Sequence, residues 1–247
     1  MTVTNTLKNG YVVSARGLAA ASGQIGLRRW LEARGETSRL AHWMLSLGAI
    51  HDLEALVALD VPWWSYDAID AVERFLRERP GARVFEYGSG ASTLWLARRA
   101  GSVTSVEHHR GWYDRMQDAL GRFPIACPVD LRLVAPDAAP SSDSLYLSEK
   151  SGSAGVSFSA YAREIDAGAD ALYDLIVIDG RSRNACLAHA ERHLAEGGMI
   201  VFDNSGRTRY RRAIAQSGLS ARRLRGLTPA LPYPDETTLL TRPAGRE

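Results

Sequence analysis

The chain has 247 residues, of which 45% are hydrophobic and 23% are charged, a balance typical of a globular protein with a full core. Its formal net charge is only +2, which argues against a strong overall field that would attract nucleic acid or a membrane surface. Cys127 and Cys186 stand alone, without a CxxC pair or a Cys/His cluster, so we expect buried, reduced thiols rather than a zinc site.

The first part of the sequence indicates helices. The opening ten residues lack the basic-then-apolar pattern of a secretory signal, and no run of 18 apolar residues occurs, so we expect a cytoplasmic protein. Residues 1–60 contain helical stretches such as LRRWLEARG and no clear strand. We therefore expect an N-terminal helical extension over residues 1–61 and a second domain over residues 62–247.

From Ser65 onward, helices and strands alternate. Ile69, Val72 and Leu76 share one helical face, and Pro80-Gly81 ends that helix. The elements expected next are a strand at 82–88, a helix at 92–100, a strand at 102–109, a helix at 112–120 and a strand at 129–136.

A polar segment interrupts the alternation at residues 138–157. It is rich in Ser, Gly and Pro, and we expect a mobile loop that covers the bound cofactor. The elements expected after it are a short helix near 158–166, a strand at 174–180, a helix at 184–198, a strand at 199–204, a helix at 208–218 and an antiparallel strand pair at 221–229 and 236–242. Apolar strands alternating with helices predict an α/β fold with a doubly wound, mostly parallel sheet.

The segment VFEYGSGASTLWLA (84–97) is a strand that runs into a helix through Gly88 and Gly90. It lacks the lysine of a phosphate-binding P-loop, and Thr93 occupies the third glycine position of a dinucleotide fingerprint. Glu86 would repel a pyrophosphate but attract an ammonium group. S-adenosylmethionine carries an ammonium and a sulfonium and no phosphate.

Glu107 ends the next strand, 19 residues after Gly88. A carboxylate at that position commonly holds a ribose diol through two charge-assisted hydrogen bonds. The pair Glu86 and Glu107 therefore favours an adenosyl cofactor site. The alternative interpretation is that both are surface-facing acids at strand ends.

At this point the sequence resembles the class I S-adenosylmethionine-dependent methyltransferases. The resemblance covers about residues 62–242 and rests on FEYGSGAS (85–92), SVEHH (105–109), DLIVIDG (174–180), the segment at 197–204 and the closing strand pair. It implies a Rossmann-like methyltransferase fold with a seven-stranded sheet whose last strand is antiparallel. The cofactor-binding positions that it implies are Glu86, Gly88, Gly90 and Ser92 at the methionine end, Glu107 at the ribose, Asp137 near the adenine, and Asp179.

The candidates for catalysis follow the later strands. Asp179 and Asp203 would end adjacent strands, and we expect both to face the acceptor pocket, with Asp179, Asp203, Arg181 and His108 as the catalytic residues. Asp179, Asp203 and Asn204 resemble the Mg²⁺ ligands of the catechol-type O-methyltransferases. That family has a lysine-bearing turn after its first Asp, whereas this chain has Gly180-Arg181, so we favour a metal-free site in which Arg181 or Arg183 supplies the positive charge.

Three further features have two interpretations each. His189 and His193 lie four residues apart on a predicted helix, which could bind a metal, but a solvated or half-buried face is the simpler interpretation. Trp63 and Trp64 could pack in the core or form a wall of the acceptor pocket. The run at 207–226 has seven arginines, which could bind RNA or lie on a solvated helix.

The sequence as a whole favours a methyltransferase acting on a small-molecule acceptor, at the oxygen of a hydroxyl group in a natural product or sugar-containing metabolite. The arginines near the site suggest an acceptor with a carboxylate, phosphate or sugar acid. The alternatives are an RNA methyltransferase, a nicotinamide-dependent oxidoreductase with a Rossmann-like fold, and an inert protein that binds the cofactor without turnover.

Overall fold

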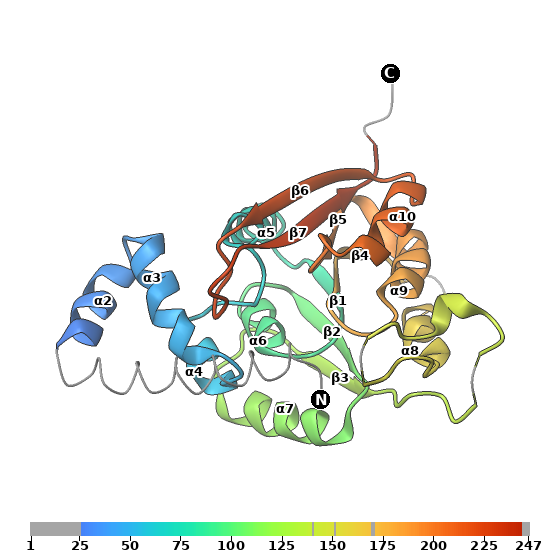
Figure 1. Cartoon of the computed structure of the whole chain (residues 1–247), viewed down its shortest axis with the longest axis horizontal. Helices are drawn as coiled ribbons and strands as arrows, with labels where there is room; N and C mark the ends of the chain where they lie inside the picture. Colours follow the sequence, from blue (N-terminus) through green and yellow to red (C-terminus); the bar gives the residue numbers. More distant parts are fainter. Residues whose placement is uncertain (1–25, 140, 151, 169–170, 244–247) are drawn as a thin grey trace.

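The computed structural model describes residues 26–139, 141–150, 152–168 and 171–243. Its centre is a seven-stranded sheet of order β3-β2-β1-β4-β5-β7-β6 (Figure 1). The strands are β1 (Arg83–Tyr87), β2 (Ser102–Glu107), β3 (Val129–Leu133), β4 (Tyr173–Ile178), β5 (Leu194–Phe202), β6 (Ser220–Gly226) and β7 (Asp235–Thr241). Neighbours from β3 to β5 are parallel, and β7 is antiparallel to both β5 and β6. The predicted doubly wound sheet with an antiparallel last strand is confirmed.

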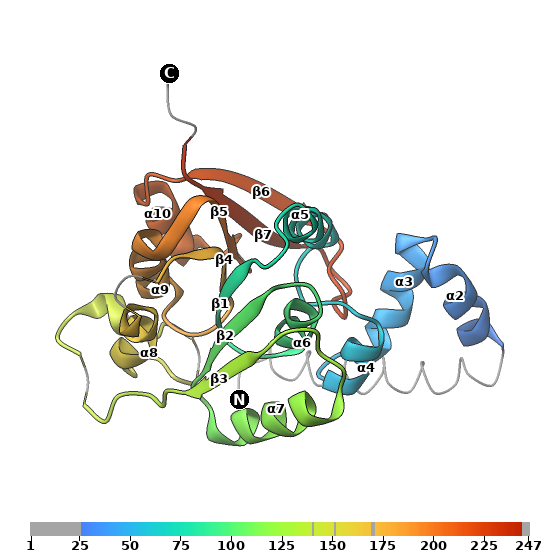
Figure 2. The ribbon, with the colours of Figure 1, turned by 180° about the vertical axis from the view of Figure 1, so that it is seen from behind.

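Helices cover both faces of the sheet because successive strand side chains point to opposite sides. On one face, Val84 and Val177 pack in a cluster with α5 (Tyr66–Arg77) and α6 (Ala91–Ala97). On the other, Phe85 and Ile178 pack with α8 (Ser159–Arg163), α9 (Arg183–Ala190) and α10 (Thr208–Gln216). Figure 2 shows α7 (Arg110–Arg122) beside β3 on the α6 side. The 3₁₀ turn η3 (Glu164–Ala167) follows α8, and η4 (Glu191–His193) follows α9.

One helix boundary differs from its prediction. The helix expected over 184–198 ends at Ala190, and β5 already begins at Leu194. Gly197 and Gly198, expected to stop the helix, lie inside the strand, where the pairing of β4 with β5 shifts register. Gly197 has φ +62°, and its carbonyl accepts a hydrogen bond from Arg79 at 2.9 Å. The glycines therefore accommodate an irregular strand entry, not a helix end.

The described part of the N-terminal extension is helical, as expected. It contains α2 (Leu27–Gly35), α3 (Arg39–Ser46), η1 (Leu47–Ala49) and α4 (Leu53–Ala58). Leu53 and Val57 of α4 pack in one cluster with Leu94 of α6, and Trp43 donates from its indole nitrogen to the carbonyl of Leu231 at 2.9 Å. The opening ten residues, where we expected no signal pattern, lie outside the described residues. Within the described part of the chain, no helix has the length and apolar character to cross a bilayer.

The segment at 138–157 carries more structure than its composition predicts. Its described residues form the 3₁₀ turn η2 (Ser144–Tyr146) and a β-bridge between Leu147 and Ser157. Tyr146 is buried, and its carbonyl accepts a hydrogen bond from Ser182 at 2.9 Å. The buried side chain of Tyr146 and its hydrogen bond to the distant residue Ser182 attach this part of the segment to the core, which its Ser and Gly content alone does not predict.

The histidine pair on α9 and η4 is buried, and the expectation of a solvated or half-buried face was wrong. His189 Nδ1 lies 2.6 Å from Asp166 Oδ2, and His193 Nε2 lies 3.0 Å from Asp166 Oδ1. His189 Nε2 is 3.0 Å from the Tyr146 hydroxyl. Both cysteines are buried free thiols, as expected.

Candidate functional site

Three cavities lie at the edge of the sheet where the parallel strands end. The central one, about 250 Å³, is lined by the loops after β1, β2 and β4; we call it the glycine cavity. It shares Gly88 and Asp179 with an apolar cavity of about 280 Å³ beside α4. It shares Gly180 and Arg181 with a basic cavity of about 500 Å³ near α10, which we call the arginine cleft. Ligands of open α/β sheets bind at this edge.

The floor of the glycine cavity is a close approach of two loops. Gly88 has φ +96°, and a Cβ atom at this position would lie 2.9 Å from the Cα atom of Gly180. A Cβ atom at Gly180 would lie 1.9 Å from the hydroxyl of Tyr161. Gly90 is different, because its φ is 177° and a Cβ there would meet nothing closer than 4.0 Å. The first glycine of the corner is therefore required by the fold itself.

Glu86 lies beneath the glycine corner and does not line any of the three cavities. It is fully buried, and its carboxylate accepts hydrogen bonds from Ser92 at 2.5 Å, Thr93 at 2.5 Å and Ser105 at 2.6 Å. Burial raises the pKa of Glu86 to about 7, against the opposing effect of these hydroxyls. Glu86 and Ser92 thus hold the start of α6 on β1 and β2.

Glu107 lines the glycine cavity at the end of β2. Its Oε1 accepts the backbone N–H groups of His108 at 2.8 Å and His109 at 2.7 Å, and its Oε2 accepts the hydroxyl of Ser89 at 3.1 Å. Burial would raise the pKa of Glu107, but His108 and these N–H groups outweigh it, and the pKa is lowered. Glu107 is therefore an ionised carboxylate that only accepts hydrogen bonds.

Two residues of this cavity were missed by the sequence analysis. His109 caps α7 by accepting the backbone N–H of Trp112 at 3.2 Å, and both side chains line the glycine cavity. Trp112 also donates from its indole nitrogen to the carbonyl of Ser89 at 2.8 Å, which ties α7 to the glycine corner. An aromatic residue in the first turn after the Glu107 strand was the signal available. The predicted residue His108 lines the same cavity, with its Nδ1 2.9 Å from Glu107 Oε1.

Asp137 lies apart from the other predicted cofactor residues, because it does not line any of the three cavities. Its carboxylate accepts the hydroxyl of Ser157 at 2.5 Å and the backbone N–H groups of Ser159 at 2.7 Å and Ala160 at 3.1 Å. Asp137 therefore closes the 138–157 segment onto the start of α8. Its predicted contact with an adenine remains a prediction.

Asp179 and Asp203 end the adjacent strands β4 and β5, as predicted, and Arg183 lies between them. Arg183 donates to Asp179 Oδ1 at 2.6 Å and to the Asp203 carbonyl, and its Nη1 lies 3.9 Å from Asp203 Oδ2. Burial raises the pKa of both carboxyls, and for Asp203 the neighbouring Asp179 raises it further.

The two carboxyls do not face the same space. Asp179 lines the glycine cavity and the apolar cavity, and its side chain is 26% exposed. Asp203 is 3% exposed, accepts the hydroxyl of Thr237 at 2.9 Å and does not line any of the three cavities. The expectation that both face the acceptor pocket was wrong for Asp203, because β7 covers it.

The proposed Mg²⁺ ligands do not fit a metal site. Arg183 already pairs with both Asp179 and Asp203, and Asn204 donates its side-chain amide to Asp235 at 2.8 Å. Across the described residues, no group of three or more His, Cys, Asp or Glu is placed to hold a metal ion. A cationic side chain thus stands where the metal-dependent arrangement would need a divalent ion.

Trp63 and Trp64 have different surroundings, and each of the two interpretations of this pair holds for one residue. Trp63 lines the cavity together with His51 and Leu56. Trp64 is fully buried and packs edge-on against Trp95, with ring centroids 5.8 Å apart. Of this pair, Trp63 can contact a bound molecule and Trp64 belongs to the core.

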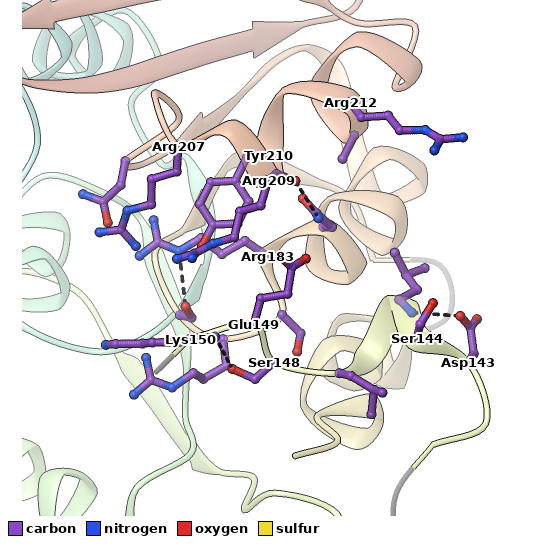
Figure 3. A pocket seen from close by; sticks show the side chains of 18 of the residues that line it. Asp143, Ser144, Ser148, Glu149, Lys150, Arg183, Arg207, Arg209, Tyr210 and Arg212 are labelled. Atoms are coloured by element: carbon purple, nitrogen blue, oxygen red, sulfur yellow. Dashed lines mark hydrogen bonds between the residues drawn. The ribbon is translucent and has the colours of Figure 1, made fainter. Parts of the chain in front are cut away.

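The arginine cleft gathers side chains from three distant segments. They come from residues 143–150, 180–184 and 204–216, and Figure 3 shows several of them around one open space. Arg207, Arg209 and Lys150 lie around this space, whereas Arg212 extends away from it (Figure 3). Residues 143–150 of the segment expected to cover the cofactor line this cleft, and the cover itself remains a prediction.

No known protein family's sequence profile matches the chain, and no curated protein matches it. Among solved structures, a methyltransferase-like protein from Silicibacter pomeroyi is 22% identical, with 73% of this chain and 88% of that chain covered and a TM-score of 0.45. The N-methyltransferase NodS from Bradyrhizobium japonicum is 16% identical, with 72% and 96% covered and a TM-score of 0.44. A Streptococcus mutans protein in complex with SAH is 12% identical, with 70% and 96% covered and a TM-score of 0.47. The strand order and the single antiparallel strand are those of the Rossmann-like methyltransferase fold expected from the sequence.

Proposed function

We propose that the protein transfers the methyl group of S-adenosylmethionine to a hydroxyl oxygen of a small-molecule acceptor. The observation that carries this proposal is Glu107, an ionised, buried carboxylate that lines the glycine cavity at the end of β2. A ribose diol supplies the two hydroxyl donors that such a carboxylate accepts. The close approach at Gly88 leaves bare backbone for the methionine end of the same cofactor.

The acidic lining also bears on the nicotinamide alternative. Glu107 and Asp179 both line the glycine cavity, with Arg181 as a cation in its wall. A pyrophosphate placed there would meet two carboxylates, whereas an ammonium group would be attracted by them. The site therefore favours S-adenosylmethionine over a dinucleotide.

Methyl transfer to a hydroxyl would form a bond from oxygen to the methyl carbon and break the bond from that carbon to sulfur, with SAH as the leaving group, and the hydroxyl proton must pass to a base. The cofactor supplies a methyl group already activated by its sulfonium. Asp179 is the proposed base, because it lines the glycine cavity and its pKa is raised by burial. Arg183 holds Asp179 Oδ1 at 2.6 Å, so Oδ2 is the oxygen proposed to take the proton. Arg183 then stabilises the arrangement without a metal, and we expect a chelator to leave the rate unchanged.

The residues predicted to be catalytic receive different roles in this proposal. Asp203 and Arg183 are positioning residues that act through Asp179, since Asp203 does not line any of the three cavities. Arg181 lines both the glycine cavity and the arginine cleft, so it can contact an acceptor that spans them. His108 lies at the cofactor end beside Glu107, where it supports the carboxylate.

Calorimetric titration with SAH, the demethylated product of the cofactor, and with NAD tests the proposal. We expect micromolar affinity for SAH and none for NAD. Glu107→Ala should weaken SAH binding by about 1.5–3 kcal/mol, the value of hydrogen bonds to a charged group.

Asp137→Ala is the matched comparison, because it removes a carboxylate that lines none of the three cavities. It should leave SAH affinity unchanged while lowering stability. If Glu107→Ala and Asp137→Ala lose SAH affinity equally, Asp137 contacts the adenine, as the sequence analysis predicts. NAD binding in place of SAH would refute the proposal as a whole.

A further inference from the structure

The arginine cleft carries positive charge that the protein does not compensate. Four of the cations that line it are Lys150, Arg181, Arg207 and Arg209. Glu149 is the acid that joins them there, while Asp143 lies at the far end beside Ser144 (Figure 3). Arg183 is already paired with Asp179 and Asp203. Three positive charges are thus left without an acidic partner among the residues that line this space.

Arg181 and Arg209 are half-buried, whereas Lys150 and Arg207 are exposed, and the cations act on one another. Partial desolvation, together with repulsion from Arg181, Arg183 and Arg207, lowers the pKa of Lys150 to about 8. The pKa of Arg181 is lowered by burial and by Arg183, and its Nε is buried without a hydrogen-bond partner among the described residues. Such groups gain stability from an anion that enters the cleft.

The cations are held in place by the fold. Arg209 stacks on the ring of Tyr210, with its guanidinium carbon 4.9 Å from the ring centroid. The backbone carbonyl of Arg209 accepts a hydrogen bond from Asn184 at 3.2 Å, which joins α10 to α9. Both helices begin at the cleft, since Arg183 and Arg207 stand at their N-terminal ends. The helix dipoles add partial positive charge at the same place.

We propose that the arginine cleft binds a phosphate group carried by the methyl acceptor, so that the substrate is a hydroxylated phosphomonoester. A phosphomonoester bears about −1.5 to −2 charges at neutral pH and three acceptor oxygens, which suits guanidinium donors. A single carboxylate would leave most of the excess charge uncompensated. The volume of about 500 Å³ is within the range of small-molecule pockets, and Arg181 joins the cleft to the glycine cavity.

Titrations with inorganic phosphate, glycerol 3-phosphate, glycerol and acetate test this inference by calorimetry on the full chain. Phosphate and glycerol 3-phosphate should bind, whereas glycerol and acetate should bind at least tenfold more weakly. Arg207→Gln and Arg209→Gln should each weaken phosphate binding about tenfold, and melting curves check that both variants fold. Arg222→Gln, on the distant strand β6, is the matched control and should bind phosphate as the parent chain does.

The inference rests on the proposed function, because it takes the phosphate-bearing molecule to be the methyl acceptor. The two proposals can fail separately. Phosphate binding with no SAH binding would refute the methyltransferase and leave the anion site standing. SAH binding with phosphate affinity unchanged by Arg207→Gln and Arg209→Gln would overturn the anion site alone. Tight, steeply salt-dependent binding of single-stranded RNA that Arg222→Gln also weakens would overturn it in favour of RNA.

Discussion

The two ends of the site treat charge in opposite ways. At the glycine end, Glu86 and Glu107 are buried acids whose oxygens are met by hydroxyls and backbone N–H groups of the protein. At the arginine end, Lys150, Arg181 and Arg207 face one another with too few acids between them. The difference teaches that the acids of the glycine end are already held by hydrogen bonds from the protein, whereas the cations of the arginine end have too few acidic partners within the cleft.

The largest effect should come from the residue between the two ends. Arg183→Ala removes the cation that pairs with both Asp179 and Asp203 and leaves a half-buried and a buried carboxylate without it. The free energy of unfolding should fall by about 3–5 kcal/mol, as for other broken buried pairs. The loss should be greater at pH 8 than at pH 5, because protonation relieves the repulsion.

Denaturant unfolding at both pH values measures the effect of Arg183→Ala. Arg212→Ala is the control, since this exposed arginine extends away from the others in the cleft (Figure 3). A loss below about 1 kcal/mol in Arg183→Ala would mean that the two ends are not joined through this residue.

The glycine end should show its own pH dependence through Glu86. Its folded pKa of about 7 is above the ordinary value of 4.5, so its stabilising contribution is complete below pH 4.5 and is lost as the pH rises to about 7. At about 1.4 kcal/mol per pKa unit, this is up to about 3 kcal/mol.

Glu86→Gln keeps the shape of the side chain and removes the titration. Its stability should therefore fall less than that of the parent chain between pH 4.5 and 7, as measured by urea unfolding at several pH values. Parallel curves for the two proteins would show that Glu86 is ionised throughout this range and that the glycine end is more polar than its burial indicates.

The close approach of the two loops gives a third test. Gly88→Ala forces a side chain into a left-handed backbone conformation and towards the backbone of Gly180, which should cost about 1–3 kcal/mol and weaken SAH binding. Gly90→Ala is the matched control, because its backbone is extended and its surroundings are open, so it should lose less than about 1 kcal/mol. If the melting temperature falls equally in both variants, the close approach of Gly88 to Gly180 is not what requires a glycine at position 88.

The smallest effect concerns the wall of the arginine cleft. Tyr146→Phe removes the hydroxyl 3.0 Å from His189 Nε2 and should lower stability by about 0.5–1.5 kcal/mol. Because Tyr146 anchors η2, protease cleavage within residues 141–150 should become faster, and phosphate should slow it again. If neither the substitution nor phosphate changes the cleavage rate, this segment does not take part in phosphate binding.

The sequence predicts the glycine end better because that end is nearly continuous in the chain. Gly88, Gly90 and Glu107 fall within 20 residues, and their order along alternating strands and helices fixes where they meet. What the local pattern does not contain is the direction of each side chain. Glu86 accepts hydrogen bonds from Ser92 and Ser105 in the structure, and its expected contact with the methionine end of the cofactor remains a prediction.

The arginine end required the fold, because it is assembled from three separate segments spread over residues 143–216. Arg183 was one of several possible cations after β4, and only the pairing of β4 with β5 places it between two carboxylates. Asp203 is covered by β7 through Thr237, a contact set by the antiparallel last strand. Asp137 looks like a strand-end acid in the sequence, and its use as a helix cap depends on where α8 begins.

The far edge of the sheet gives the arginine-rich end of the chain a second meaning. Strand β6 pairs with β7 on one side and forms an edge of the sheet (Figure 1). Its residues Arg222, Arg223 and Arg225 are exposed. An edge strand offers unpaired backbone groups to any other chain, and a row of like charges repels a second copy that approaches in register. We expect these three arginines to disfavour edge-to-edge pairing of two copies through β6.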